Sequence, residues 1–263
     1  MLGSAEQPVS LHMRQHVFLA VAVLLTLSPS LVPVFLELFS GTGGLSAAVE
    51  RWGGYSLRWD VLHGAEYDLT VAANVVRILA WLRAGLIWGV HCAMECKSWS
   101  IARHGEIRSR RHIWGKARLS QVDRRKVEAG NALLRASMSI LLACWRFHIP
   151  VGFENPHSSI CFHAPPMLSF AKRRGVKETY FDMCAFGTPY RKRTRLLHYG
   201  CNMTRLMSHR CKSNLKCEGS LCSFTGMAHK VLKFETAEAA KEYPPALNTL
   251  LAESYATAYN RRH

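Results

Sequence analysis

The stretch Phe35-Leu-Glu-Leu-Phe-Ser-Gly-Thr-Gly-Gly44 decides the fold, because an apolar run passes directly into a glycine-rich turn. In α/β proteins, a strand that ends in closely spaced glycines and leads into a helix brings the backbone against a nucleotide-like cofactor. Small residues allow the sharp turn, and a helix expected over Leu45–Trp52 points its unbonded amide groups toward the ligand. We therefore expect a cofactor site at the end of this first strand.

The composition is that of a globular protein with a strongly basic surface. The chain has 263 residues, 49% of them hydrophobic, which is enough for one α/β domain with a small appendage. Lys and Arg number 34 against 18 Asp and Glu, for a net charge of +16. Such an excess favours a polyanionic partner, nucleic acid ahead of a membrane surface, over a basic face that contacts only solvent.

The cysteines and the N-terminus bear on the compartment. Nine cysteines, an odd number scattered along the chain, do not resemble the disulfide framework of a secreted protein. We therefore expect a reducing compartment, nuclear or cytoplasmic. The apolar run Val17–Leu27 is short for a membrane span. It is either a signal-peptide core or an extra helix before the first strand, and the cysteine composition favours the helix. No stable membrane insertion is expected.

Strand and helix patterns alternate along the rest of the chain. Further strands are expected at Tyr55–Asp60, Gly85–Val90, Ile149–Phe153, Tyr180–Phe186 and Thr194–Tyr199, and helices at Val71–Ala84, Asp123–Phe147 and Thr236–Tyr259, the last interrupted at Pro244. This alternation predicts an α/β fold with a doubly wound, mostly parallel sheet. Residues 101–126 are rich in Arg and Lys with few apolar positions, which indicates a loop or an exposed segment.

Two acids follow the second strand. Asp60 ends that strand, where a carboxylate can accept the ribose hydroxyls of a bound nucleoside. Asp68 is a candidate partner for the exocyclic amine of a purine. The alternative for both acids is a helix cap or a turn residue.

A thiol lies in the loop after the strand Gly85–Val90, in Glu95-Cys96-Lys97-Ser98-Trp99-Ser100. The carboxyl end of a parallel strand is where α/β enzymes place reactive groups, and a basic neighbour such as Lys97 favours the thiolate. The alternative is a buried structural cysteine. Cys92 is a rival nucleophile.

A carboxyl group ends the next strand, in Phe153-Glu154-Asn155-Pro156. Glu154 can bind a heterocyclic base and give it a proton if burial raises its pKa. A helix cap or an ion pair is the alternative. The last motif runs from Phe186 to Leu196 and carries four cations in five positions after a Gly-Thr-Pro turn, which suits contacts with phosphate or carboxylate groups as well as a solvated face.

Taken in order, these motifs resemble those of the DNA (cytosine-5) methyltransferase family. Its opening Asp-Leu-Phe-Ala-Gly-x-Gly-Gly is matched by Glu37–Gly44, its Pro-Cys-Gln-x-Phe-Ser loop by Glu95–Ser100, its Glu-Asn-Val by Glu154–Pro156, and its Gln-x-Arg-x-Arg by Tyr190–Arg195. The resemblance covers about residues 33 to 200 and, more faintly, 236 to 259. It implies a Rossmann-like fold of the S-adenosylmethionine-dependent methyltransferase type.

The resemblance also implies a role for each matching residue. S-adenosylmethionine would be held by Phe39, Ser40, Gly41, Thr42, Gly43, Gly44, Asp60 and Asp68. Cys96 would attack carbon-6 of a cytosine in DNA, Glu154 would bind and protonate the ring nitrogen, and Asn155 would position the loop. Arg193 or Arg195 would support Glu154 and the base. The basic stretch 101–126 would grip the phosphates around an extruded cytosine.

The sequence departs from the family at the nucleophile. Glu95 replaces the proline and Lys97 replaces the glutamine, and an anion beside Cys96 raises the pKa of a thiol. Cofactor binding is therefore better supported than turnover. Two alternatives stay open: a catalytically degenerate nucleic-acid-binding protein that retains the fold, and an enzyme that methylates cytosine in RNA.

We expect four regions: a leader or extra helix (1–31), the catalytic domain (32–200), a small cysteine-rich region in place of a target-recognition domain (201–235), and C-terminal helices that complete the catalytic domain (236–263). The third region offers weak zinc candidates, Cys201, Cys211, Cys217 and Cys222, with His209 and His229 nearby. Because no Cys-x-x-Cys pair is present, ordinary free thiols are favoured over a metal site.

Overall fold

A computed structural model describes residues 32–100, 107–213, 221–232 and 240–261. The expected N-terminal segment 1–31, with the apolar run at residues 17–27, lies outside the described residues. The chain from Pro33 onward forms one compact unit.

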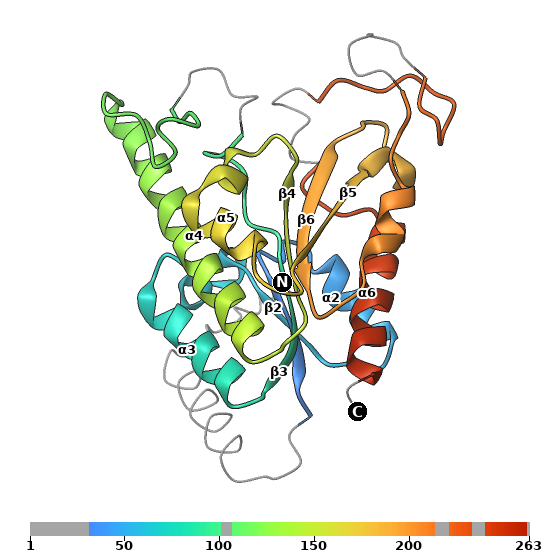
Figure 1. Cartoon of the computed structure of the whole chain (residues 1–263), viewed down its shortest axis with the longest axis horizontal. Helices are drawn as coiled ribbons and strands as arrows, with labels where there is room; N and C mark the ends of the chain where they lie inside the picture. The colour runs from blue at the N-terminus through green and yellow to red at the C-terminus, as the bar shows by residue number, and fades with distance from the viewer. Residues whose placement is uncertain (1–31, 101–106, 214–220, 233–239, 262–263) are drawn as a thin grey trace, which may run out of the picture. The chain divides into compact units, whose positions relative to one another are not determined.

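A six-stranded sheet runs through this unit (Figure 1). Its strands are β1 (Val34–Leu38), β2 (Ser56–Trp59), β3 (Ile87–Cys92), β4 (Val151–Pro156), β5 (Lys177–Asp182) and β6 (Arg193–Tyr199), in the order β2-β1-β3-β4-β6-β5. Strands β2, β1, β3 and β4 are parallel neighbours, whereas β6 runs antiparallel to both β4 and β5. The sheet is therefore mixed but mostly parallel, which confirms the α/β class expected from the alternating patterns.

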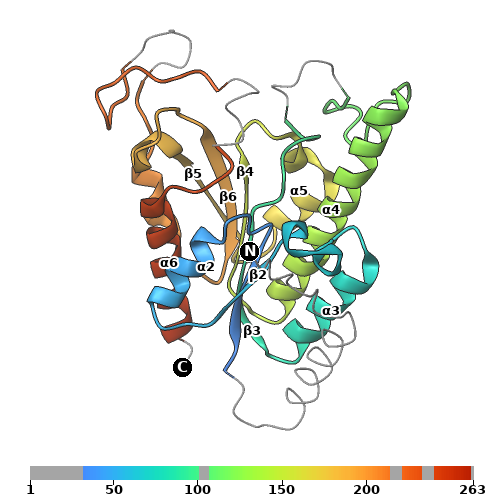
Figure 2. The same cartoon turned by 180° about the vertical axis from the view of Figure 1, so that it is seen from behind.

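Helices cover both faces of the sheet, as Figures 1 and 2 show. They are α2 (Gly44–Arg51), α3 (Ala72–Arg83), α4 (Gln121–Arg146), α5 (Pro165–Ala171) and α6 (Pro245–Asn260). Side chains of α2 and α6 pack on one face, and those of α3, α4 and α5 pack on the other. Strands covered on both faces need apolar side chains in both directions, which explains why Phe35 of β1 packs on one face and Leu36 and Leu38 pack on the other.

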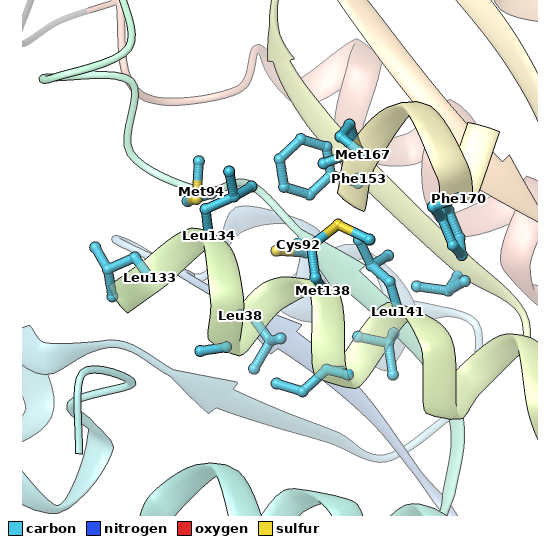
Figure 3. Close-up of a cluster of buried hydrophobic side chains, with 14 of the residues drawn as sticks. Leu38, Cys92, Met94, Leu133, Leu134, Met138, Leu141, Phe153, Met167 and Phe170 are labelled. Carbon is cyan, nitrogen blue, oxygen red and sulfur yellow. The ribbon is translucent and has the colours of Figure 1, made fainter. Parts of the chain in front are cut away.

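Helix α4 supplies much of the larger core cluster. Ser120 caps its first turn by accepting the amide of Asp123 at 3.1 Å, and apolar residues then recur at helical spacing. Figure 3 shows Leu134, Met138 and Leu141 of this helix in one cluster with Cys92 of β3 and Phe153 of β4. Among the described helices α4 alone is long and apolar enough to cross a membrane, but 61% of its apolar window is buried in the fold, as in the core helix of a globular domain.

One strand, one added helix and the start of the last helix differ most from the sequence expectation. The strand expected at residues 180–186 begins earlier, at Lys177, and ends at Asp182, where Met183–Phe186 form a 3-10 turn. Helix α5 was not expected, although prolines in its first turn are typical of a helix start. The C-terminal helix begins only at Pro245, so the expected interruption is its N-terminus, and residues 236–239 lie outside the described residues.

The connections define a switch point in the sheet. From β1 the chain passes through α2, on one face, to β2 on one side. It then passes through α3, on the opposite face, to β3 on the other side of β1. Such a reversal leaves a crevice at the carboxyl ends of β1 and β3, where ligands bind in open α/β sheets.

Candidate functional site

The glycine turn after β1 has the backbone that its sequence predicts. Phe39, Gly41 and Gly43 adopt left-handed φ values of 57°, 51° and 73°. At Gly43 a Cβ atom would lie 2.5 Å from the side chain of Arg58, and the positive φ is strained for any residue that has a Cβ atom. At Gly41 a Cβ atom would meet nothing within 4 Å, so the turn is open on that side.

Two polar side chains at this turn have buried oxygens without a hydrogen-bond partner among the described residues. The hydroxyl of Ser40 is buried and has no hydrogen-bond partner among the described residues. The side-chain oxygen of Asn248, on α6, is likewise unpaired within the part of the chain that the structure describes. This side chain packs so closely on Gly44 that a Cβ atom there would lie 2.6 Å from its amide nitrogen. Buried unpaired oxygens are uncommon, and here they lie beside an open turn, which fits a polar ligand.

The two acids expected to hold the cofactor have backbone partners. Asp60 accepts the amide of Gly41 on Oδ2 and the amide of Leu62 on Oδ1, each at 2.9 Å. Asp68 accepts the amide of Thr70 at 2.8 Å. Both acids therefore serve as cap or turn residues, the alternative that the sequence left open. Asp60 in addition connects the glycine turn to the end of β2.

Sequence reasoning missed a third acid, Glu37. Its carboxylate is buried and accepts the amide of Ser46 at 2.8 Å, in the first turn of α2. Burial raises the pKa of Glu37, and the bonds from Ser46 oppose this effect. An acid at the amide-rich start of a helix is favourable. Its place in an apolar strand hid this role.

Cys96 lies in the loop that follows β3. Its carbonyl accepts the amides of Trp99 and Ser100 at 2.9 and 2.8 Å, which closes a tight turn around the thiol. The side chain is half-buried. Burial raises the pKa of the Cys96 thiol; the charge of Lys192 lowers this pKa, and Glu154 and Glu95 raise it.

Cys92, the rival nucleophile, is part of the core. Its thiol donates to the hydroxyl of Ser137 at 3.5 Å, and burial raises its pKa to about 12. Figure 3 shows the sulfur of Cys92 among apolar side chains such as Met138. Because attack requires an accessible thiolate, Cys96 is the better candidate of the two.

Glu154 is a buried carboxyl group at the end of β4. Its Oε2 accepts the hydroxyl of Tyr243 at 3.0 Å, whereas Oε1 is buried with no partner in the described ranges. Burial raises the pKa of Glu154, while Lys192 and the bond from Tyr243 oppose this rise. A carboxyl group with a raised pKa and one unpaired oxygen is suited to binding and protonating a ligand.

Asn155 connects this strand to the thiol loop. Its side-chain amide donates to the carbonyl of Met94 at 2.6 Å, two residues before Cys96. Since Met94 lies two residues after the end of β3, this bond fixes the path of the loop relative to β4. The carboxyl group of Glu154 and the thiol of Cys96 are thus held by neighbouring parallel strands.

Behind Glu154, a buried chain of rings continues from Tyr243 to His91 and Tyr255. The two nitrogens of His91 lie 3.0 Å from the Tyr243 hydroxyl and 3.2 Å from the Tyr255 hydroxyl. Burial lowers the pKa of His91 to about 3, so its ring is neutral at physiological pH. Sequence reasoning missed these three residues, because each is unremarkable in its own stretch.

The arginines expected to support Glu154 pair with other carboxylates. Arg193 makes two bonds to Asp182, at 3.0 and 3.1 Å, and Arg195 donates to Glu178 at 2.8 Å. Strand register explains this correction, because Arg195 lies opposite Asn155, whereas Leu196 lies opposite Glu154. Adjacent residues of a strand point to opposite faces, so Arg195 faces away from Glu154 and stacks on the ring of Phe162.

Lys192 supplies the cation near the two reactive groups instead. Its ammonium group donates to the carbonyl of Ala240 at 2.6 Å, and its charge acts on both Cys96 and Glu154. The residue has a positive φ of 28°, an uncommon backbone for a lysine. A lysine within a run of cations gave no separate signal in the sequence.

The basic stretch divides into one buried arginine and several exposed cations. Arg108, expected to contact phosphates, is buried; it donates to Ser98, Ile113, Val127 and Asn131, and its guanidinium lies 3.6 Å from the ring centroid of Trp99. It therefore joins the thiol loop to α4. Arg110, Arg111, Arg118, Arg124, Arg125 and Lys126 are exposed, and residues 101–106 lie outside the described ranges.

The zinc candidates separate in space. Cys201 directs its thiol toward the carbonyls of Tyr199 and Val151, at 3.6 and 3.9 Å. Cys211 and Cys222 come together with Cys184 and His229, and Cys217 lies in the undescribed segment 214–220. His209 instead stacks on the ring of Phe186.

The comparisons with known proteins add no family. No protein-family model matches this chain, and a search of curated proteins finds no match. The functional interpretation therefore depends on the geometry of the site and on the order of the motifs.

Proposed function

We propose that this chain is an S-adenosylmethionine-dependent methyltransferase that acts on carbon-5 of cytosine in DNA. The observation that carries the proposal is the pairing of Cys96 with Glu154. A half-buried thiol and a buried carboxyl group with a raised pKa are held at the ends of adjacent strands, joined by the bond from Asn155 to Met94. Cys96 follows β3, one of the two strands at the switch point, and Glu154 is on β4, the next parallel strand.

The residues present fit the cofactor at the glycine turn. Residues 39–44 would hold it, with the open position at Gly41 and the unpaired hydroxyl of Ser40 available to a polar ligand. Asp60 would act by holding the turn through the amide of Gly41, and Asp68 would flank it. When bound, S-adenosylmethionine supplies an electrophilic methyl group.

In the proposed reaction the thiolate of Cys96 forms a bond to carbon-6 of the cytosine while Glu154 gives its proton to ring nitrogen-3. The electron pair of the 5,6 double bond would then be available at carbon-5. Bound S-adenosylmethionine would supply the methyl group there, and the electron pair of the broken sulfur–methyl bond would stay on sulfur in the leaving S-adenosylhomocysteine. Removal of the carbon-5 proton by a base breaks the bond to sulfur, and Glu154 recovers the proton from nitrogen-3. Lys192 favours the thiolate of Cys96 at the start. A cytosine in a duplex must first leave the stack, at a cost of a few kcal/mol.

The test is transfer of a labelled methyl group to duplex DNA, compared among the wild type, Cys96→Ser and Cys92→Ser. We expect transfer by the wild type, a loss of at least about a thousandfold in Cys96→Ser, and retained transfer in Cys92→Ser, whose thiol is in the core. DNA with 5-fluorocytosine should trap a complex of protein and DNA that survives denaturation, because fluorine blocks loss of the carbon-5 substituent. Full transfer by Cys96→Ser would reject the assigned nucleophile.

One observation favours a second candidate, a nucleic-acid-binding protein without catalysis. Glu95 lies beside the thiol, pairs with Lys97 at 2.9 Å, and raises the pKa of Cys96. In that case DNA binding would be tight and salt-dependent, while S-adenosylmethionine would neither raise the melting temperature nor support methyl transfer. The same assay with RNA in place of DNA tests the remaining alternative, an RNA cytosine methyltransferase.

A further inference from the structure

A cluster of three cysteines and a histidine joins the turn after β5 to the cysteine-rich region that follows β6. It contains Cys184, from the 3-10 turn that follows β5, together with Cys211, Cys222 and His229. Figures 1 and 2 show residues 221–232 (orange) at the same end of the fold as the loops that follow the parallel strands. We propose that these four side chains bind one Zn²⁺ ion in a closed structural site, independently of the function proposed above.

The spacing of the ligand atoms fits a tetrahedron. The Cys211 sulfur lies 3.9 Å from the Cys222 sulfur and 3.8 Å from Nε2 of His229. The four ligand atoms all lie within 4.8 Å of one another. Bonds of about 2.3 Å from Zn²⁺ to sulfur, at tetrahedral angles, separate two sulfurs by about 3.8 Å. A disulfide would need about 2.05 Å, so the sulfurs are spaced for an ion between them.

Groups around the ligands are oriented for thiolates and a neutral imidazole. The amides of Ser223 and Phe224 point at the sulfurs of Cys211 and Cys222, at 3.4 and 3.5 Å. Ser213 lies 3.4 Å from Nδ1 of His229, which leaves Nε2 facing the sulfurs. Outer contacts of this kind orient metal ligands and are a regular part of zinc sites.

The segment has little else to hold it together. Its apolar side chains Leu221, Phe224, Met227 and Val231 are 65%, 44%, 63% and 62% exposed. The buried cluster in this part of the described structure consists of three cysteines, Cys184, Cys211 and Cys222. A segment with such a small core needs a cross-link to stay folded, and the binding free energy of a metal ion can stabilise it.

The site would also fasten the cation-bearing segment before β6. Asp182, two residues before Cys184, accepts the amide of Cys211 at 2.8 Å and pairs with Arg193. Arg191 donates to the carbonyls of Cys211 and Ser213 at 2.9 and 2.8 Å. Lys192 lies between these two arginines, so zinc would hold in place the backbone that carries it.

The test is the metal content of the full chain, purified under reducing conditions without chelator and compared with Cys222→Ser and Cys201→Ser. Cys201 is a matched control because its thiol contacts the carbonyls of Tyr199 and Val151 and stands outside the cluster. We expect one zinc per chain in the wild type and in Cys201→Ser, and a loss of at least tenfold in affinity for Cys222→Ser. Retention of zinc by Cys222→Ser would overturn the proposal.

A second measurement keeps the test valid if the variant folds poorly. Replacement of zinc by Co²⁺ in the wild-type chain should give the visible bands of a tetrahedral site and sulfur-to-metal charge-transfer bands with the intensity of three thiolates. Chelation should then make residues 221–232 sensitive to protease while the α/β core stays resistant. A chain that binds neither Zn²⁺ nor Co²⁺, or whose Co²⁺ spectrum lacks thiolate bands, contradicts the site.

Discussion

The hydroxyl of Tyr243 donates to Oε2 of Glu154 over 3.0 Å, and this bond joins the C-terminal part of the chain to the end of β4. Tyr243 lies just before α6, far from Glu154 in sequence. The buried carboxyl group of Glu154 therefore has a hydrogen-bond partner on Oε2, whereas its Oε1 has none among the described residues. The state of this carboxyl group is therefore the first property to test.

The stability of the fold should depend on the ionisation of Glu154. Because burial raises its pKa above the unfolded value, the folded chain binds more protons than the unfolded chain between the two pKa values. The free energy of unfolding should therefore fall as pH rises through this window. In Glu154→Gln this fall in unfolding free energy should be smaller. The melting temperature of the variant minus that of the wild type should therefore increase between pH 4 and pH 8. Parallel curves in calorimetry would contradict this prediction.

Tyr243→Phe should raise the pKa of Glu154 further. The bond from Tyr243 lowers the pKa of Glu154, so its removal should raise that pKa and extend the fall to higher pH. The infrared band of a protonated carboxyl group, assigned by its loss in Glu154→Gln, should persist to higher pH in Tyr243→Phe than in wild type. A band that vanishes at lower pH in the variant would be the opposite of what the contact requires.

The reactivity of Cys96 should respond to two neighbours in opposite directions. Glu95→Gln should lower the pKa of the thiol, because Glu95 raises it, and Lys192→Met should raise that pKa, because Lys192 lowers it. The measurement is the pH dependence of alkylation by iodoacetamide, followed by the mass of the peptide that carries Cys96. Lys192→Arg keeps the charge and serves as the control. Shifts of the same sign in both variants would show that another charge controls the thiol.

Asn155→Ala should loosen the loop of Cys96. The substitution removes the donor of the 2.6 Å bond and leaves the carbonyl of Met94 without it, which costs about 1–3 kcal/mol. We expect a lower midpoint in urea unfolding and faster alkylation of Cys96 at fixed pH. Asn202→Ala is a matched control: its side chain is exposed and bonds only locally to Thr204, so the change should be within about 0.5 kcal/mol.

Substitution of Arg108 should lower the stability of the fold, whereas substitution of Arg110 should affect only nucleic-acid binding. Arg108→Ala empties a buried position whose hydrogen-bond acceptors on the thiol loop and α4 lose their donor, and should cost at least about 3 kcal/mol of unfolding free energy. Arg110 is exposed, so Arg110→Ala should leave stability nearly unchanged. If Arg110 contacts a phosphate, its loss should reduce the salt slope of DNA binding by about 0.9. Equal effects of the two substitutions on stability would contradict this division.

Local patterns were sufficient for the elements that alternate along the chain. The glycine turn and the helices expected around residues 71–84 and 123–147 lie within about two residues of the expected bounds. Apolar periodicity and glycine conformation act over a few neighbouring residues, which is why a single sequence contains them. The short helix α5 carried too few turns for such a pattern.

Local sequence patterns did not predict which side chains contact each other. Arg195 was expected near Glu154, but strand alternation turns it to the other face, toward Phe162. Arg108 looked like one more surface cation, yet it is buried against Trp99. In each case the deciding neighbour comes from another element, and its distance in sequence gives no hint of the contact.

The sequence by itself determined the class of fold, the glycine turn, and the presence of a thiol and a carboxyl group at consecutive parallel strands, because these follow from local spacing. Only the tertiary structure decided which cation faces Glu154, which arginine is buried, and which three cysteines meet His229. Cys184 follows β5, beside the start of β6, and its partners follow β6, whose end lies at the opposite end of β5. They come together because the chain after β6 returns to the end of β5, where Asp182 bonds to His209 and Cys211. Such contacts are set by the packing of whole elements, and that packing is a property of the complete fold.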